Sequence, residues 1–168
     1  MSGFRIKTEI DLTDKMRRAA QSMNGVSVNV GVMSGEHAWL AGIHEYGCKI
    51  PVTNKMRAYL HSIGVHPKES TKEITIPERS FLRSGYDLNR DDVLKSAERV
   101  LVDVLGGTLS EEEYFELIGT TLRDAIKEYA IDLSDPPKKD WPTRNPAKNN
   151  PLVDTGDMIN GIEYELER

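Results

Sequence analysis

The strongest structural signal in the chain is LSEEEYFELIGTTLRDAIKEYAI, residues 109–131. Ser110 and Glu113 have the spacing of a capping box, in which each side chain bonds the backbone N–H of the other residue. Leu109 precedes the box and can pack on Tyr114 as a hydrophobic staple. Apolar residues then recur at helical spacing for more than four turns. The stretch predicts a long helix whose apolar stripe must be covered by this chain's sheet or by a neighbouring subunit.

Two further helices are predicted on either side of the middle of the chain. Residues 91–105 place apolar side chains on one face, with Asp91 and Asp92 at the positive end of the helix dipole and Gly106-Gly107 after the last turn. Residues 36–46 predict a shorter helix that Gly47 ends. Its expected buried side consists of Trp39, Leu40, Ile43 and Tyr46.

Alternation of apolar and polar residues predicts three strands. The clearest covers residues 26–32, where valine occupies every second position. Residues 4–10 alternate in the same way and precede an amphipathic helix over residues 11–23. Residues 162–166 alternate with glutamates, as in a terminal edge strand. The first two strands could pair in one small sheet with the intervening helix on its face.

Together these elements predict an α+β fold, with a small, mostly antiparallel sheet packed with two or more long helices, plus extended loops. The length of 168 residues suits a single domain, residues 1–168. Residues 48–90 are predicted to be an irregular excursion that carries a helix over 54–63 and a short strand near 74–76. Residues 134–151 hold five of the eight prolines and predict a mobile loop with Trp141 as its one large anchor.

The composition excludes several classes of protein. With 38% hydrophobic and 29% charged residues the chain is not wholly disordered, and a net charge of −5 argues against a surface that binds nucleic acid throughout. The single cysteine, Cys48, excludes an intrachain disulfide framework. No apolar run reaches the roughly 20 residues that span a bilayer, and charge appears too early for a signal peptide. We therefore expect a protein that is made and kept in a cytoplasm.

Two short patterns could carry chemistry, and each has a simpler structural explanation. Asp154-Thr155-Gly156 is the tripeptide of aspartic proteases, but only 12 residues follow it, too few for the rest of such a fold, so a helix cap explains it better. His44 and Cys48 are metal-ligand types, but a structural zinc site needs four ligands and the chain has no second cysteine. The sequence thus predicts no catalytic residues, no cofactor and no metal.

Residues 138–148 suggest a function of a different class. Four cations surround Trp141: Lys138, Lys139, Arg144 and Lys148. A base could stack on the indole while the cations meet phosphates, although Asp135 and Asp140 dilute the positive charge. The alternative hypothesis is therefore a small nucleic-acid- or host-protein-binding module that uses this basic loop.

Three phrases, taken in order, resemble one protein family. They are Ile43-His44-Glu45-Tyr46-Gly47, Ile76-Pro77-Glu78-Arg79-Ser80-Phe81-Leu82-Arg83 and Pro151-Leu152-Val153-Asp154-Thr155-Gly156. Their order resembles the tailed-bacteriophage tail-completion and neck proteins, including those labelled virion morphogenesis or minor tail proteins. The resemblance spans roughly residues 40–164. Ser80 departs from the pattern, because family members commonly carry proline at this position.

The resemblance implies a structural virion protein, a tail-completion or neck component in head–tail joining that works as an oligomeric ring. The implied partners are neighbouring neck or tail-tube proteins and further copies of this chain, which would form a ring in the virion and be monomeric in solution. DNA would be only cargo through the channel, and no membrane is involved. The implied location is the virion, after assembly in the host bacterial cytoplasm. The family brings no catalytic residues, so the chain is not expected to be an enzyme.

Six residues are candidates for an interface: Glu45, Tyr46, Arg79, Phe81, Arg83 and Trp141. Tyrosine, phenylalanine, tryptophan and arginine are bulky residue types that often anchor protein interfaces. Arg79, Phe81 and Arg83 are predicted to alternate on an extended segment, as one aromatic anchor flanked by cations. Phe81 has two equally supported interpretations, as an interface anchor or as a core residue of this chain, because anchors and core residues look alike in sequence.

Overall fold

The computed structural model describes residues 13–33, 35–137 and 150–168, and its α+β architecture agrees with the predicted fold class. In chain order the elements are α1 (Thr13–Ser22), β1 (Ser27–Val32), α2 (Gly35–Tyr46), β2 (Cys48–Pro51), α3 (Asn54–Ser62), β3 (Glu73–Ile76), α4 (Phe81–Gly106), α5 (Glu111–Asp132), α6 (Asp157–Asn160) and β4 (Ile162–Glu167). The described strands form two antiparallel sheets of two strands each. The predicted strand over residues 4–10 lies outside the described residues.

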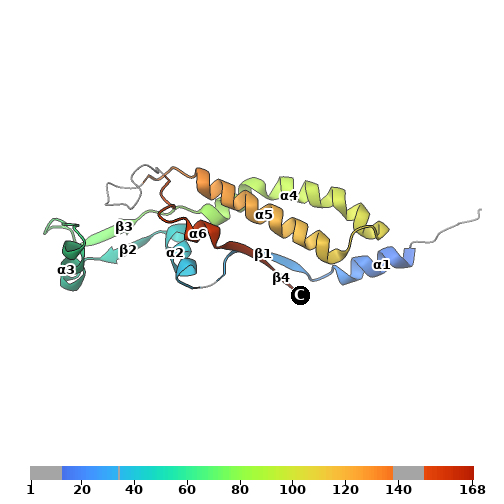
Figure 1. Cartoon of the computed structure of the whole chain (residues 1–168), viewed down its shortest axis with the longest axis horizontal. Coiled ribbons are helices and arrows are strands. Elements are labelled where there is room, and N and C mark those ends of the chain that lie inside the picture. The colour runs from blue at the N-terminus through green and yellow to red at the C-terminus, as the bar shows by residue number, and fades with distance from the viewer. Residues whose placement is uncertain (1–12, 34, 138–149) are drawn as a thin grey trace, which may run out of the picture.

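The paired helices α4 and α5 form the centre of the molecule, side by side in Figure 1. Gly107 has φ 74° and ends α4, which allows the chain to turn back within a few residues. The predicted capping box then starts α5, because the Ser110 hydroxyl accepts the Glu113 N–H at 3.2 Å and the Glu113 carboxylate accepts the Ser110 N–H at 2.9 Å. Val93, Leu122 and Ile126 are buried where the two helices meet. This confirms the predicted long helix, which begins at Glu111 after its capping box.

The β1–β4 sheet covers another side of α5. Its register places Val30 opposite Tyr164 and Val32 opposite Ile162. A Cβ built on Gly119 would lie 2.3 Å from the Tyr164 ring, so this glycine lets the sheet approach the helix. The predicted terminal strand is therefore confirmed, with β1 as its partner.

Residues 48–76 form a projecting unit that we call the arm, made of the β2–β3 pair with α3 at its tip (Figure 1). The Thr53 hydroxyl caps α3 by accepting the Met56 N–H at 3.2 Å. The guanidinium of Arg57 donates to the carbonyls of Pro67 and Lys68, each at 3.0 Å, and Leu60 of the same helix is buried. The tip therefore has its own small core. The predicted helix near 54–63 and strand near 74–76 are confirmed, but this part of the excursion is ordered rather than irregular.

The start of α4 corrects two predictions. This helix begins at Phe81 rather than near residue 91, so residues 81–90 are helical. Arg79, Phe81 and Arg83 consequently do not alternate on an extended segment, because Phe81 and Arg83 already belong to the first turn. The buried side chain of Phe81 and the buried Gly85 lie one turn apart on the inner face of the helix. Asp91 and Asp92 are in the helix interior and mark no helix start.

Two smaller predictions also need correction. In α2 the buried residues are Ala41 and Glu45, while Trp39, Leu40 and Tyr46 of the expected buried side are exposed. The N-cap of α6 is Gly156, not Asp154 or Thr155 (the Thr155 hydroxyl accepts the Asp157 N–H at 3.4 Å). The burial of Glu45 depends on the start of α4, which lies more than thirty residues away in the sequence.

Candidate functional site

The first two phrases of the family resemblance meet where the arm leaves the body. We call this region, residues 44–47 together with 77–83, the joint. The Arg79 N–H donates to the carbonyl of His44 at 2.7 Å, which connects the end of α2 to the segment before α4. Segments that are more than thirty residues apart in the sequence thus form one contact region.

Glu45 supplies the cap for α4 from another helix. Its side chain is only 3% exposed, and its carboxylate oxygens accept the N–H groups of Leu82 at 2.9 Å and Arg83 at 3.0 Å. Ser80, at the N-cap position of α4, makes no side-chain cap bond. A negative carboxylate at a helix N-terminus satisfies unpaired amides and complements the helix dipole. Glu45 therefore fixes where α4 begins.

Arg83 closes the joint on its solvent side. Its Nε donates to the Glu45 carboxylate at 2.9 Å, and its Nη2 donates to the Glu45 carbonyl at 3.0 Å and to the Glu78 carboxylate at 2.7 Å. Hydrogen bonds to Glu45 and then Glu78 raise the pKa of Arg83 above its ordinary value. The guanidinium also lies 4.8 Å from the centre of the Tyr46 ring. Arg83 and Tyr46 thus form one exposed surface over a buried carboxylate.

Arg79 connects the joint to the segment that follows α5. It is 6% exposed, its Nε donates to the Pro136 carbonyl at 2.8 Å, and its Nη2 donates to the Pro137 carbonyl at 3.2 Å. Its Nη1 lies 3.4 Å from Nδ1 of His44. Burial lowers the pKa of Arg79 from its ordinary value. This guanidinium is directed at backbone carbonyls, so its role in the joint is to hold chain segments together.

Gly47 makes the sharp turn between α2 and the arm. Its φ is 68°, a left-handed conformation that side chains rarely adopt. A Cβ here would lie 2.7 Å from the Glu78 nitrogen and 2.9 Å from the Ile76 carbonyl oxygen. Only glycine allows the strand β3 and the following segment to pass this close to the end of α2.

The third phrase packs against the same core. Leu152 is buried in the cluster that contains Phe81 and Ala41. The Asn150 side chain donates to the Ala130 carbonyl at 2.8 Å and accepts the Leu152 N–H at 2.7 Å, so it connects the end of α5 to this phrase. All three phrases of the resemblance therefore contribute to one packed region around the start of α4.

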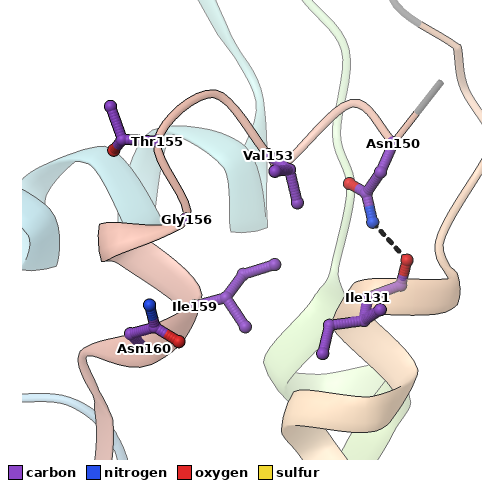
Figure 2. Close-up of a pocket in the computed structure, with 7 residues that line it drawn as sticks. All are labelled: Ile131, Asn150, Val153, Thr155, Gly156, Ile159 and Asn160. Carbon is purple, nitrogen blue, oxygen red and sulfur yellow. Dashed lines mark hydrogen bonds between the residues drawn. The ribbon is translucent and has the colours of Figure 1, made fainter. Parts of the chain in front are cut away.

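A shallow pocket of about 480 Å³ lies beside the third phrase (Figure 2). Ile131, Val153 and Ile159 give it an apolar lining, and Asn150 donates across its edge to the Ile131 carbonyl at 2.5 Å. The residues that line it carry no charge. The pocket thus offers an apolar surface with amide and hydroxyl groups at its rim.

The candidate residues divide into three groups. Glu45 and Arg79 are buried in the joint, and Phe81 is 0% exposed, which selects the core reading for this ring. Tyr46 and Arg83 share the exposed side of the joint. Trp141 and the basic loop around it lie outside the described residues.

Sequence reasoning missed the partners that complete the joint. Glu78 and the carbonyls of Pro136 and Pro137 were not among the candidates, and Glu45 was not recognised as a cap for α4. Ser80 followed by the pair Phe81-Leu82 was an available signal for an earlier helix start. A backbone carbonyl that accepts a hydrogen bond from a distant arginine cannot be recognised in the sequence, because every residue has a backbone carbonyl.

No family model, no curated protein and no solved structure matches this chain. In the described segments no helix has the length and apolar character needed to cross a membrane. Among the same residues, no group of three or more His, Cys, Asp or Glu side chains could hold a metal ion.

Proposed function

We propose that this chain is a structural protein of a tailed-phage virion, a tail-completion or neck component in head–tail joining. The observation that carries the proposal is the joint. The phrases that resemble the family come from distant parts of the sequence, yet they pack around the start of α4 and the base of the arm. Residues that act together in one structural feature are a stronger basis for a resemblance than three separate short matches.

The chemistry of the joint supports a role through shape rather than through bond-making. Glu45 is occupied by two backbone amides and Arg83, and Arg79 by two backbone carbonyls. Groups engaged and buried in this way hold the backbone in place. We infer that the protein acts as an oligomeric, non-enzymatic ring in which the joint sets the direction of the arm.

The partners in this proposal are other copies of the chain and the adjoining neck or tail-tube proteins. DNA passes as cargo through the channel and is not a ligand of the fold. The protein is located in the virion after assembly in the bacterial cytoplasm. A projecting arm on a rigid body suits this role, because each copy must contact more than one neighbour.

Deletion of the gene in the phage or prophage that carries it tests the proposal. Electron microscopy of the lysates should show unjoined heads and tails, or overlong tails, and the wild-type gene in trans should restore joined particles. Complementation with Glu45→Ala should fail or be weak, while the control Glu78→Gln, which changes an exposed carboxylate of the same joint, should succeed. Normal infectious particles in the absence of the gene would exclude this function.

A further inference from the structure

The arm and the body carry opposite charge. Residues 48–76 contain five lysines and arginines and two glutamates, a net charge of +3. The other described residues contain twenty-two acidic and eleven basic side chains, a net charge of −11. The basic arm of one copy is therefore attracted to the acidic body of another copy, whereas two arms or two bodies repel each other.

The arm presents a defined contact stripe at its tip. Lys55 and Tyr59 lie four residues apart in α3, and Ile63, its C-cap, follows four residues later, so the three side chains lie along one side of the tip. Tyr59 is 59% exposed and Ile63 is exposed beside it, whereas Leu60 fills the core of the tip on the other side. We call these three residues the arm stripe. Two apolar groups next to a cation are left uncovered although the tip already has its own core.

The body presents a complementary stripe on the outer face of α4. Its residues alternate at spacings of three and four, as in the seam of a coiled coil: Leu88, Asp91, Lys95, Glu98 and Val102. All five are exposed, with Leu88 at 69% and Val102 at 70%. The one cation, Lys95, is paired with Asp92 at 3.0 Å. We call these five residues the body stripe, and α5 packs on the opposite side of the same helix.

We propose that the arm stripe of one copy docks on the body stripe of a second copy. This inference rests on the proposed function and names the contact that would build the ring. The arm cannot make the contact within its own chain, since Figure 1 shows it leading away from the joint in the direction opposite to the run of α4. With Ile63 of one copy packed on Val102 of the other, Lys55 lies about 12 Å further along α4, between Asp91 and Glu98. Such a heterologous contact closes into a ring when its rotation closes.

The alternative self-contacts are disfavoured by charge. An arm packed on another arm brings two units of +3 together, and two bodies packed through α4 bring carboxylates against carboxylates. Only arm against body pairs opposite charges and covers apolar groups on both sides. The arm docking on a second copy is therefore the pairing that the described surfaces support.

Disulfide trapping between two single-cysteine proteins tests the proposal directly. In a Cys48→Ser background, Ile63→Cys is placed in one protein and Val102→Cys in the other, and the two are mixed under mild oxidation at high protein concentration. A disulfide-linked heterodimer is expected. The matched control replaces Val102→Cys by Glu165→Cys, an exposed position on β4, and should give no more product than random collision. Trapping captures short-lived contacts, so the result is decisive even for a protein that is monomeric at equilibrium.

Charge reversal distinguishes a disulfide formed at a specific contact from one formed by random collision. Lys55→Glu added to the Ile63→Cys protein should lower the yield about fivefold, as expected when an exposed attractive pair becomes repulsive. Glu98→Lys in the Val102→Cys protein should restore it. Circular dichroism of each variant verifies that the fold is intact. A yield at the control level, or one that charge reversal does not alter, overturns the proposal.

Two other results would also overturn the docking proposal, and each would indicate a different contact for the arm. Strong Ile63→Cys homodimers without heterodimers would show that the arms pair with each other. Salt-sensitive binding of a DNA oligonucleotide that Lys55→Glu removes, with no heterodimer, would assign the basic arm to nucleic acid. If gene deletion leaves heads and tails unjoined while trapping fails, only the docking contact is lost. If deletion leaves normal particles, the virion function itself is wrong.

Discussion

The joint and the arm each depend on an arginine that donates to backbone carbonyls, but the two arginines act over very different distances along the chain. Arg57 in the arm bonds carbonyls 10 to 14 residues away. Arg79 in the joint bonds a carbonyl 57 residues away, in the segment after α5. The arm can therefore organise its tip locally, whereas the joint exists only when α2, α4 and the end of α5 are assembled. The following experiments test this difference between a local unit and a long-range one.

The largest loss of stability is expected from Phe81→Ala. The ring is fully buried in the main cluster at the start of α4, so its removal loses apolar burial and leaves a cavity. The free energy of unfolding, measured by urea denaturation, should fall by about 3–5 kcal/mol. The control Leu88→Ala removes an exposed side chain from the same helix and should stay within about 0.5 kcal/mol. Equal losses in both variants would contradict the assignment of Phe81 to the core.

Glu45→Gln should cause the second-largest loss of stability. The NH2 group that replaces one carboxylate oxygen would face the backbone N–H of either Leu82 or Arg83, so one of these two donors loses its acceptor. Denaturation should show a loss of about 1–3 kcal/mol. Glu78→Gln is the matched control because it contacts Arg83 from an exposed position, and its effect should be below about 0.5 kcal/mol. If the two substitutions were equally mild, α4 would not depend on a cap from α2.

Ser110→Ala should have a smaller effect that depends on pH. Loss of the N-cap of α5 should cost about 1 kcal/mol at neutral pH. Hydrogen bonds from the Ser110 hydroxyl and then its backbone N–H hold the pKa of Glu113 below its ordinary value. The stability from this carboxylate is therefore present above the unfolded pKa of about 4.3 and is lost as pH falls through the lower folded pKa. Denaturation curves at several pH values should show the difference between the two proteins becoming smaller in acid, and a constant difference would argue against a contribution of the Glu113 carboxylate to the capping box.

The smallest effect on the body is expected from Leu60→Ala in the tip of the arm. Leu60 is buried, but its contacts are local to the tip, so hydrogen exchange of the α3 amides should accelerate while unfolding of α4 and α5 changes by less than about 0.5 kcal/mol. A fall in global stability as large as that of Phe81→Ala would mean that the arm and the body unfold as one unit.

The sequence by itself predicted the elements whose signals are local. The Ser110 and Glu113 box, the alternating valines of β1 and the alternating end of the chain each depend on neighbours within a few residues, and each was found in the structure. The end of α2 at Gly47 could also be predicted from the sequence, because a positive φ favours glycine at that position.

The side of a helix that becomes buried was decided only by tertiary structure. Trp39 and Tyr46 are more apolar than Glu45, yet Glu45 is inside because the first turn of α4 offers it amide donors. The same contact moved the start of α4 to Phe81, ten residues before the expected position. Local pattern determines which segments are helices and strands, since it depends on spacing along one chain segment. Burial and capping depend on groups that arrive from distant segments, and a single sequence contains no record of which ones will meet.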